Sequence, residues 1–187
     1  MLNCEVKMNA SKLVNSMLVA LVVCAVAVAA EEAPVRVELS EIHMCCGVCR
    51  KAVEKAVAEV EGAKVAIDEE EWTATVTAPD IKTAQAALDE IAKAGFSGKI
   101  EDEAVAKQVA FKKVKTADGK VAKLEVTHLH NCCKGCSEAI IEAIEGVEGV
   151  TSHSVKPKQV EFVVEGDFVA ADLVKAICDA GFYPQVK

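Results

Sequence analysis

Apolar and polar residues alternate at the start of the first patterned segment and then change to a helical spacing. Val35, Val37 and Leu39 alternate with polar neighbours, which predicts a strand. Residues 48–60 carry an apolar stripe with charged residues opposite, which predicts a helix that ends at Gly62. The stripe consists of Val48, Ala52, Val53, Ala56, Val57 and Val60.

Two short strands, a second helix and a last strand complete this first unit. We expect Trp72, Ala74 and Val76 to face inward, because they alternate with polar residues along one strand. The expected elements are strands near 64–68 and 72–77, a helix over 81–94 and a last strand at 96–100.

The same order of patterns returns in the second part of the chain. The expected elements there are a strand to about 128, a helix over 136–147, strands near 151–155 and 160–164, a helix over 168–180 and a strand at 182–187. Val160, Phe162 and Val164 are predicted to face inward. The β-α-β-β-α-β order predicts an α+β chain with two ferredoxin-like domains in tandem.

The sequence itself also repeats, which supports two copies of one unit. "VELSEIHMCCGVC" at 37–49 aligns with "LEVTHLHNCCKGC" at 124–136 at an offset of 87 residues, and "AGF" recurs at 94–96 and 180–182. We therefore expect domain 1 at 35–102 and domain 2 at 121–187.

Residues 103–120 form a basic connector between the predicted domains. It carries five lysines against Glu103 and Asp118. "QVAFKKVK" (108–115) is compatible with a short strand that folds back toward 121–127, but we favour a solvated link that sets the distance between the domains.

The N-terminus has the pattern of a secretory signal. Met17–Ala30 is an uncharged apolar run of 14 residues that follows Lys7 and Lys12 and closes on small residues. It is shorter than the roughly 20 residues that cross a bilayer. We predict a cleaved signal peptide at 1–30 and an exported, periplasmic or extracellular, protein. A retained anchor, or a lipoprotein modified at Cys24, are the alternatives.

The charge balance excludes one class of partner. The net charge is −8, and removal of residues 1–30 leaves 19 basic against 28 acidic side chains. Such an acidic chain does not hold a phosphate backbone by charge, so we expect no nucleic-acid partner. After signal cleavage we expect no membrane association either.

Each unit carries a cluster of cysteines between its first strand and first helix. "HMCCGVC" spans 43–49 and "HNCCKGC" spans 130–136. We expect each helix to begin on the last cysteine of its motif, where backbone N–H groups and the helix dipole favour a thiolate. Two thiolates three residues apart can bind one soft metal ion, and a disulfide between Cys46 and Cys49 is an alternative.

These motifs resemble those of the heavy-metal-associated domain family, which includes copper chaperones and the periplasmic mercury-binding protein. Met44, Cys45, Cys46 and Cys49 match the Met-x-Cys-x-x-Cys pattern of that family, and "AGF" before the last strand also matches. The resemblance covers nearly all of the chain after the predicted signal, except the connector. It implies a ferredoxin-like fold in which each CxxC binds one soft ion, without catalysis.

The resemblance implies a metal-ligand set and also shows departures. The predicted ligands are Cys46, Cys49, Cys133 and Cys136, and Cys45 and Cys132 are candidates for a third sulfur in each site. Asn131 stands where the family has Met, which puts the stability of that loop in question. We interpret His43 and His130 as surface residues of the loops, with metal ligation as the alternative, and His128 and His153 as incidental. Cys178, Phe96 and Phe182 are expected to be core residues, with shielding of the sites as an additional role for the two phenylalanines.

The sulfur ligands favour Cu(I), with Hg(II) or Zn(II) as alternatives. We therefore predict an exported metal-binding protein, not an enzyme, that handles a soft ion in trafficking or sequestration through a CCxxC site in each domain. A metal-handling protein or transporter is the expected partner. One ion shared by both motifs, a thiol–disulfide exchange protein and a disulfide-stapled docking module are the alternatives.

Overall fold

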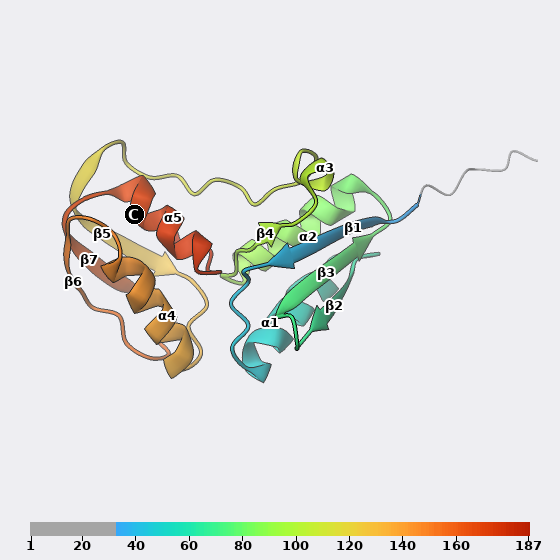
Figure 1. Ribbon diagram of the computed structural model, residues 1–187, viewed down its shortest axis with the longest axis horizontal. Coiled ribbons are helices and arrows are strands. Elements are labelled where there is room, and N and C mark those ends of the chain that lie inside the picture. Colours follow the sequence, from blue (N-terminus) through green and yellow to red (C-terminus); the bar gives the residue numbers. More distant parts are fainter. Residues whose placement is uncertain (1–32) are drawn as a thin grey trace, which may run out of the picture. The chain divides into compact units, whose positions relative to one another are not determined.

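The first predicted unit folds into a four-stranded sheet with two helices. The computed structural model describes residues 33–187, so the predicted signal peptide lies outside the described residues. The sheet is antiparallel with the order β2-β3-β1-β4. The elements, shown in Figure 1, are β1 (Val35–Ser40), α1 (Gly47–Ala58), β2 (Lys64–Asp68), β3 (Thr73–Ala78), α2 (Ile81–Lys93) and β4 (Lys99–Ile100).

The second unit repeats this arrangement after a short helix, α3 (Glu103–Ala106). Its sheet is antiparallel with the order β6-β7-β5-β8. The elements are β5 (Lys120–His128), α4 (Lys134–Glu145), β6 (Val150–His153), β7 (Phe162–Val169), α5 (Ala170–Asp179) and β8 (Gln185–Val186). The predicted α+β class is confirmed, and the two four-stranded sheets with their helices fit tandem ferredoxin-like domains. We call them the first and second halves; together they form one compact unit from Glu32 to Lys187.

Each half buries one face of its sheet beneath its helices. Val37 pairs with Val76 across the first sheet, Leu124 pairs with Val164 across the second, and all four side chains are buried. The helices contribute apolar residues at helical spacing, such as Val53 and Val57 on α1. Among residues 33–187, none of the helices is both long and apolar enough to span a bilayer.

Three residues that the pattern placed inward are exposed instead. Val48 is 60% exposed in the first turn of α1, where its side chain precedes the buried stripe. Trp72 is 48% exposed and Val160 is 41% exposed, because each lies before its strand begins, at Thr73 and Phe162. The strand alternation therefore starts one residue pair later than predicted at both positions.

The connector, predicted to be a solvated link, is mostly exposed, but single residues anchor it to both halves, and 108–115 is not a strand. Val109 is buried, and Gln85 on α2 exchanges two hydrogen bonds with the backbone of Ala110, at 2.9 and 3.0 Å. In the second half, the Tyr183 hydroxyl donates to the Lys112 carbonyl at 2.7 Å. These side-chain contacts were not visible as a periodic pattern, since each uses a single residue.

Candidate metal-binding site

Each cysteine motif lies where a loop becomes a helix. Cys46 and Cys133 are the N-cap residues of α1 and α4, and neither helix has an acidic residue in its first turn. The helices begin two residues earlier than predicted, so Cys49 and Cys136 lie within the first turn, and both are buried. Sulfur is therefore the anionic group available to the unpaired backbone N–H groups there.

The two motifs, 87 residues apart in sequence, meet in one place. Within each half the CxxC sulfurs converge, with Sγ–Sγ distances of 3.5 Å for Cys46–Cys49 and 3.7 Å for Cys133–Cys136. Between the halves, Cys45 lies 3.6 Å from Cys133 and Cys49 lies 3.5 Å from Cys132. We call the six sulfurs the joined thiol site; its members are Cys45, Cys46, Cys49, Cys132, Cys133 and Cys136.

All six predicted site residues are thus brought together, although the expectation was a site in each domain. Cys45 and Cys132, the candidate third sulfurs, contact the opposite motif: Cys45 lies 3.6 Å from Cys136 and Cys132 lies 3.6 Å from Cys46. Cys45 is exposed, so the site is open to solvent on one side. Whether each half also holds an ion by itself stays a prediction.

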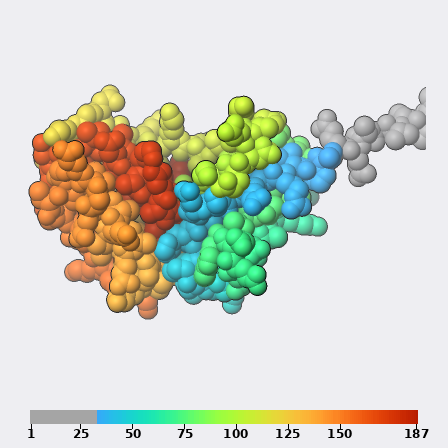
Figure 2. All heavy atoms as spheres, viewed as in Figure 1, coloured from blue at the N-terminus to red at the C-terminus, as the bar shows by residue number. Residues whose placement is uncertain are grey.

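The halves meet through the recurring "AGF" segments, which contact the opposite cysteine loop. The amide of His130 donates to the carbonyl of Gly95 at 3.3 Å, and the amide of His43 donates to the carbonyl of Gly181 at 3.5 Å. Phe96 and Phe182 form an antiparallel bridge between them. Each half therefore gives one hydrogen bond to the "AGF" segment of the other half. Figure 2 shows the red spheres of the last helix against the blue spheres of the first motif.

Glycine is required where each "AGF" segment contacts the opposite cysteine loop. Gly95 and Gly181 each have a φ of +88°, which side chains rarely adopt. A Cβ on Gly95 would lie 2.3 Å from the His130 nitrogen, and one on Gly181 would lie 2.3 Å from the His43 nitrogen. The close approach of the halves thus depends on two residues without side chains.

The two motif histidines are partly buried between the halves, so their interpretation as surface residues is wrong. The His43 ring lies 4.5 Å from the Phe182 ring, and the His130 ring lies 4.3 Å from the Phe96 ring, measured between centroids. The Nε2 atom of each histidine is buried without a hydrogen-bond partner. A buried donor or acceptor without a partner is costly, so these two atoms are candidates for ligation.

The other histidines and Cys178 lie outside the joined thiol site. His128 Nε2 lies 3.0 Å from the Lys93 carbonyl and so links the halves, and His153 lies 3.5 Å from Glu145. Cys178 is half-buried on α5 rather than fully buried, and burial raises the pKa of its thiol to about 11. It makes a useful control thiol.

The surroundings of the sulfurs shift the pKa values of several of them in opposite directions. Hydrogen bonding from the Cys49 amide lowers the pKa of Cys46 to about 7, whereas burial raises the pKa of Cys132 to about 12. The contact between Cys49 and Cys136 raises the pKa of Cys49 and lowers the pKa of Cys136. A metal ion that binds here must therefore displace the protons of the thiols whose pKa is raised.

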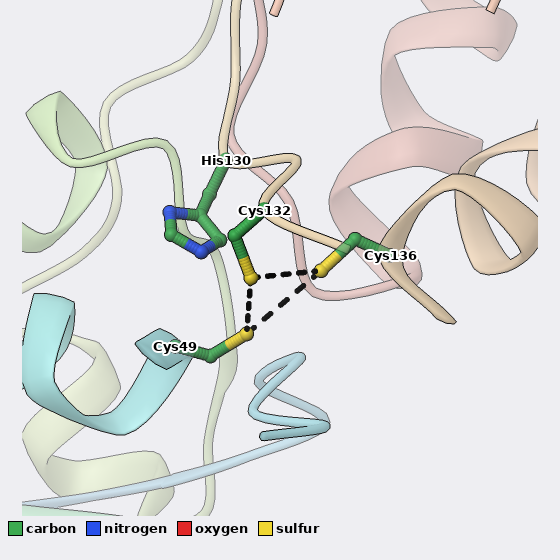
Figure 3. A group of neighbouring side chains, drawn as sticks. All are labelled: Cys49, His130, Cys132 and Cys136. Carbon is green, nitrogen blue, oxygen red and sulfur yellow. Dashed lines mark hydrogen bonds between the residues drawn. The ribbon is translucent and has the colours of Figure 1, made fainter. Parts of the chain in front are cut away.

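Three overlapping groups of side chains can hold a metal ion. Figure 3 shows the first of them, in which the sulfurs of Cys49, Cys132 and Cys136 point toward one another beside the His130 ring. The second group consists of His43, Cys45 and Cys136, and the third of Cys45, Cys46 and Cys133. Every group takes ligands from both halves, which sequence spacing within one motif could not reveal. In the sequence, the only hint that the motifs meet was that the histidine before each motif and "AGF" recur at nearly the same offset as the cysteines.

The fold and the site thus define an α+β chain with two four-stranded antiparallel sheets and a cysteine cluster that can hold metal. No family model and no curated protein matches the chain.

Two solved structures show weak similarity. The N-terminal soluble domains of Bacillus subtilis CopA share 18% identity, with coverage of 83% of this chain and 95% of theirs and a TM-score of 0.32. The first two RRM domains of the yeast poly(U) binding protein Pub1 share 14% identity, with coverage of 82% and 98% and a TM-score of 0.25. At these scores neither similarity carries an argument about function.

Proposed function

We propose that this chain is an exported protein that binds soft metal ions, Cu(I) in preference to Hg(II) or Zn(II), for trafficking or sequestration. The observation that carries the proposal is the joined thiol site, in which every sulfur lies within 3.9 Å of at least two others. The proposed role is binding and delivery, without catalysis. The proposed domains are residues 35–102 and 121–187.

The choice of ion follows from the donor atoms. Thiolates select soft ions such as Cu(I) over Mg²⁺ or Ca²⁺. The group of Cys49, Cys132, Cys136 and His130 has the composition of a structural zinc site, which keeps Zn(II) as the alternative. We favour Cu(I) because six adjacent sulfurs exceed what one zinc ion uses.

Export and delivery rest on other features. The apolar run at Met17–Ala30 supports export by a cleaved signal. Exposure of Cys45 supports delivery, because an incoming thiolate of a metal-handling protein or transporter can reach the ion there. We expect to recover the protein outside the cytoplasm with its N-terminus near residues 30–31. Exported protein that still begins at Met1 would contradict cleavage.

Metal binding is tested by native mass spectrometry of the fully reduced chain titrated with Cu(I), Zn(II) or Hg(II) against a competing chelator. We expect Cu(I) to be retained at the highest chelator concentration. Cys49→Ser combined with Cys136→Ser should weaken retention by more than about 100-fold, since even outer-shell partners of a metal site contribute about 10–100-fold.

Cys178→Ser is the matched control, because it also removes a thiol but lies outside the joined thiol site. Retention of Cu(I) should be unchanged in this variant. No uptake of any of the three ions by reduced protein would overturn the proposal. Reduction of insulin disulfides at the rate of a dedicated oxidoreductase would instead favour thiol–disulfide exchange.

A further inference from the structure

The sulfurs of the joined thiol site form triangles that span the halves. Cys46, Cys49 and Cys132 are separated by 3.5, 3.6 and 3.5 Å. Three further triangles have all edges at or below 3.9 Å. They are Cys45–Cys49–Cys136, Cys45–Cys133–Cys136 and Cys49–Cys132–Cys136. Each of the four takes sulfurs from both halves, so none survives if the halves separate.

The triangle edges suit three-coordinate ions. With a metal–sulfur bond of about 2.3 Å, two sulfurs lie about 4.6 Å apart around a linear ion and about 4.0 Å apart around a trigonal one. The observed separations of 3.5–3.9 Å are close to the trigonal value. A small outward movement of the sulfurs would admit an ion, whereas linear coordination would require larger shifts.

Several sulfurs belong to more than one triangle and can therefore bridge ions. Cys49 and Cys136, the two buried sulfurs, each lie in three triangles. Cys45 and Cys132 each lie in two. A thiolate sulfur has three lone pairs and can bind up to three soft ions, so neighbouring triangles can be filled together.

Charge also requires more than one monovalent ion. Six thiolates with one Cu(I) would carry a net charge of about −5. Two of the six sulfurs, those of Cys49 and Cys136, are buried, and crowded like charges repel one another strongly there. The N-termini of α1 and α4 supply only about half a positive charge each. Several monovalent cations are therefore needed to balance the charge of six thiolate ligands.

We propose that the joined thiol site takes up several Cu(I) ions as one thiolate-bridged cluster shared by the halves, instead of one ion per motif. If each of the four triangles takes one ion, the cluster holds about four ions, with Cys46 and Cys133 each bound to one of them and the other four sulfurs bridging. This rests on the proposed function, since it presumes that the chain binds Cu(I).

Two measurements on the full reduced chain test the cluster. In native mass spectrometry during Cu(I) titration, we expect a species with about four ions to appear while species with one or two stay scarce. X-ray absorption at the copper edge should show sulfur ligands and a short Cu–Cu path. Two independently filled ions without a Cu–Cu path would overturn the cluster but leave Cu(I) binding intact. No Cu(I) uptake at all would overturn the proposed function itself.

A glycine variant tests whether the halves must meet. Gly95→Ala with Gly181→Ala would place Cβ atoms 2.3 Å from backbone nitrogens of the opposite loop, so the halves must move apart, and it retains all six cysteines. We expect this variant to lose the Cu–Cu path and to bind fewer ions. An unchanged cluster would overturn the joined arrangement.

Gly119→Ala is the matched control for backbone strain. Gly119 also has a positive φ, +78°, but nothing lies within 4 Å of its added Cβ. Its copper load should equal that of the unchanged chain.

If the double variant fails to fold, as circular dichroism would show, Cys133→Ser replaces it, because Cys133 lies in only one of the four triangles. A folded Cys133→Ser protein should keep a Cu–Cu path with fewer ions; loss of all copper clustering would contradict the bridging by the other five sulfurs.

Discussion

The two cysteine loops have the same sulfurs but different supports beneath them. In the first half, Met44 is 2% exposed and packs in the apolar core. In the second half, the corresponding Asn131 is also buried, but it is held by hydrogen bonds. Its Nδ2 donates to the carbonyls of Lys156 and Gln159 at 3.0 and 2.9 Å, and its Oδ1 accepts from Ser137 at 2.9 Å.

The comparison shows that a buried position can be filled by two kinds of chemistry with one structural result. Met44 needs only apolar neighbours, whereas Asn131 needs three partners in place at once. Asn131 stands where the resembling family has Met, and we therefore expected a less stable second loop. The hydrogen bonds of Asn131 to Ser137 and to the segment before β7 instead hold this loop in place. Each support should fail when it is moved to the other half.

The largest expected effect is that of Met44→Asn. The change removes apolar burial and leaves an amide without partners in the core, which together cost about 4 kcal/mol. Urea denaturation should show this loss in the free energy of unfolding. Met44→Leu is the control, with an expected cost below about 1.5 kcal/mol. Equal stabilities of the two variants would contradict an apolar support.

A smaller loss is expected for Asn131→Ala. Two carbonyls and one hydroxyl lose their partner, and a buried polar group left unsatisfied costs about 1–3 kcal/mol. We expect a total of about 3 kcal/mol in the same urea measurement. Ser137→Ala removes only one of these hydrogen bonds and should cost about 1 kcal/mol. If Ser137→Ala were the more costly variant, Asn131 would not be the centre of this network.

The smallest effect is one of reactivity, and it compares Cys46 of the first loop with Cys132 of the second. The pKa of Cys46 lies at about 7, below its ordinary value of 9.0, whereas that of Cys132 lies at about 12. At pH 8 the metal-free chain should therefore be alkylated at Cys46 at least about tenfold faster than at Cys132, because only the thiolate reacts.

The pH dependence of this reaction has a defined sign. A lowered thiol pKa stabilises the fold above the unfolded value of 9.0, and that contribution is lost as the pH falls from 9 to 7. Alkylation of Cys46 should fall with a midpoint near pH 7, measured by peptide mass spectrometry after short labelling. A midpoint near 9 would show that the Cys49 amide does not stabilise this thiolate.

The sequence determined the fold and the identity of the sulfur donors. Alternation at Val35, Val37 and Leu39, followed by a helical stripe, specified each element in order, because strand and helix periods differ. The repeat at an offset of 87 residues then specified two similar halves. The prediction of an inward side chain was wrong at Val48, Trp72 and Val160, because periodicity does not say at which residue an element begins to be buried.

Only the tertiary structure decided that the two cysteine motifs form one site. The contacts that join the halves are made by Gly95 and Gly181 and by the ring contacts of His43 with Phe182 and of His130 with Phe96. Each is a contact between residues far apart in sequence, made by loops that have no periodic pattern. Local spacing specifies which sulfurs share a loop, but which loops approach each other depends on packing across the whole unit.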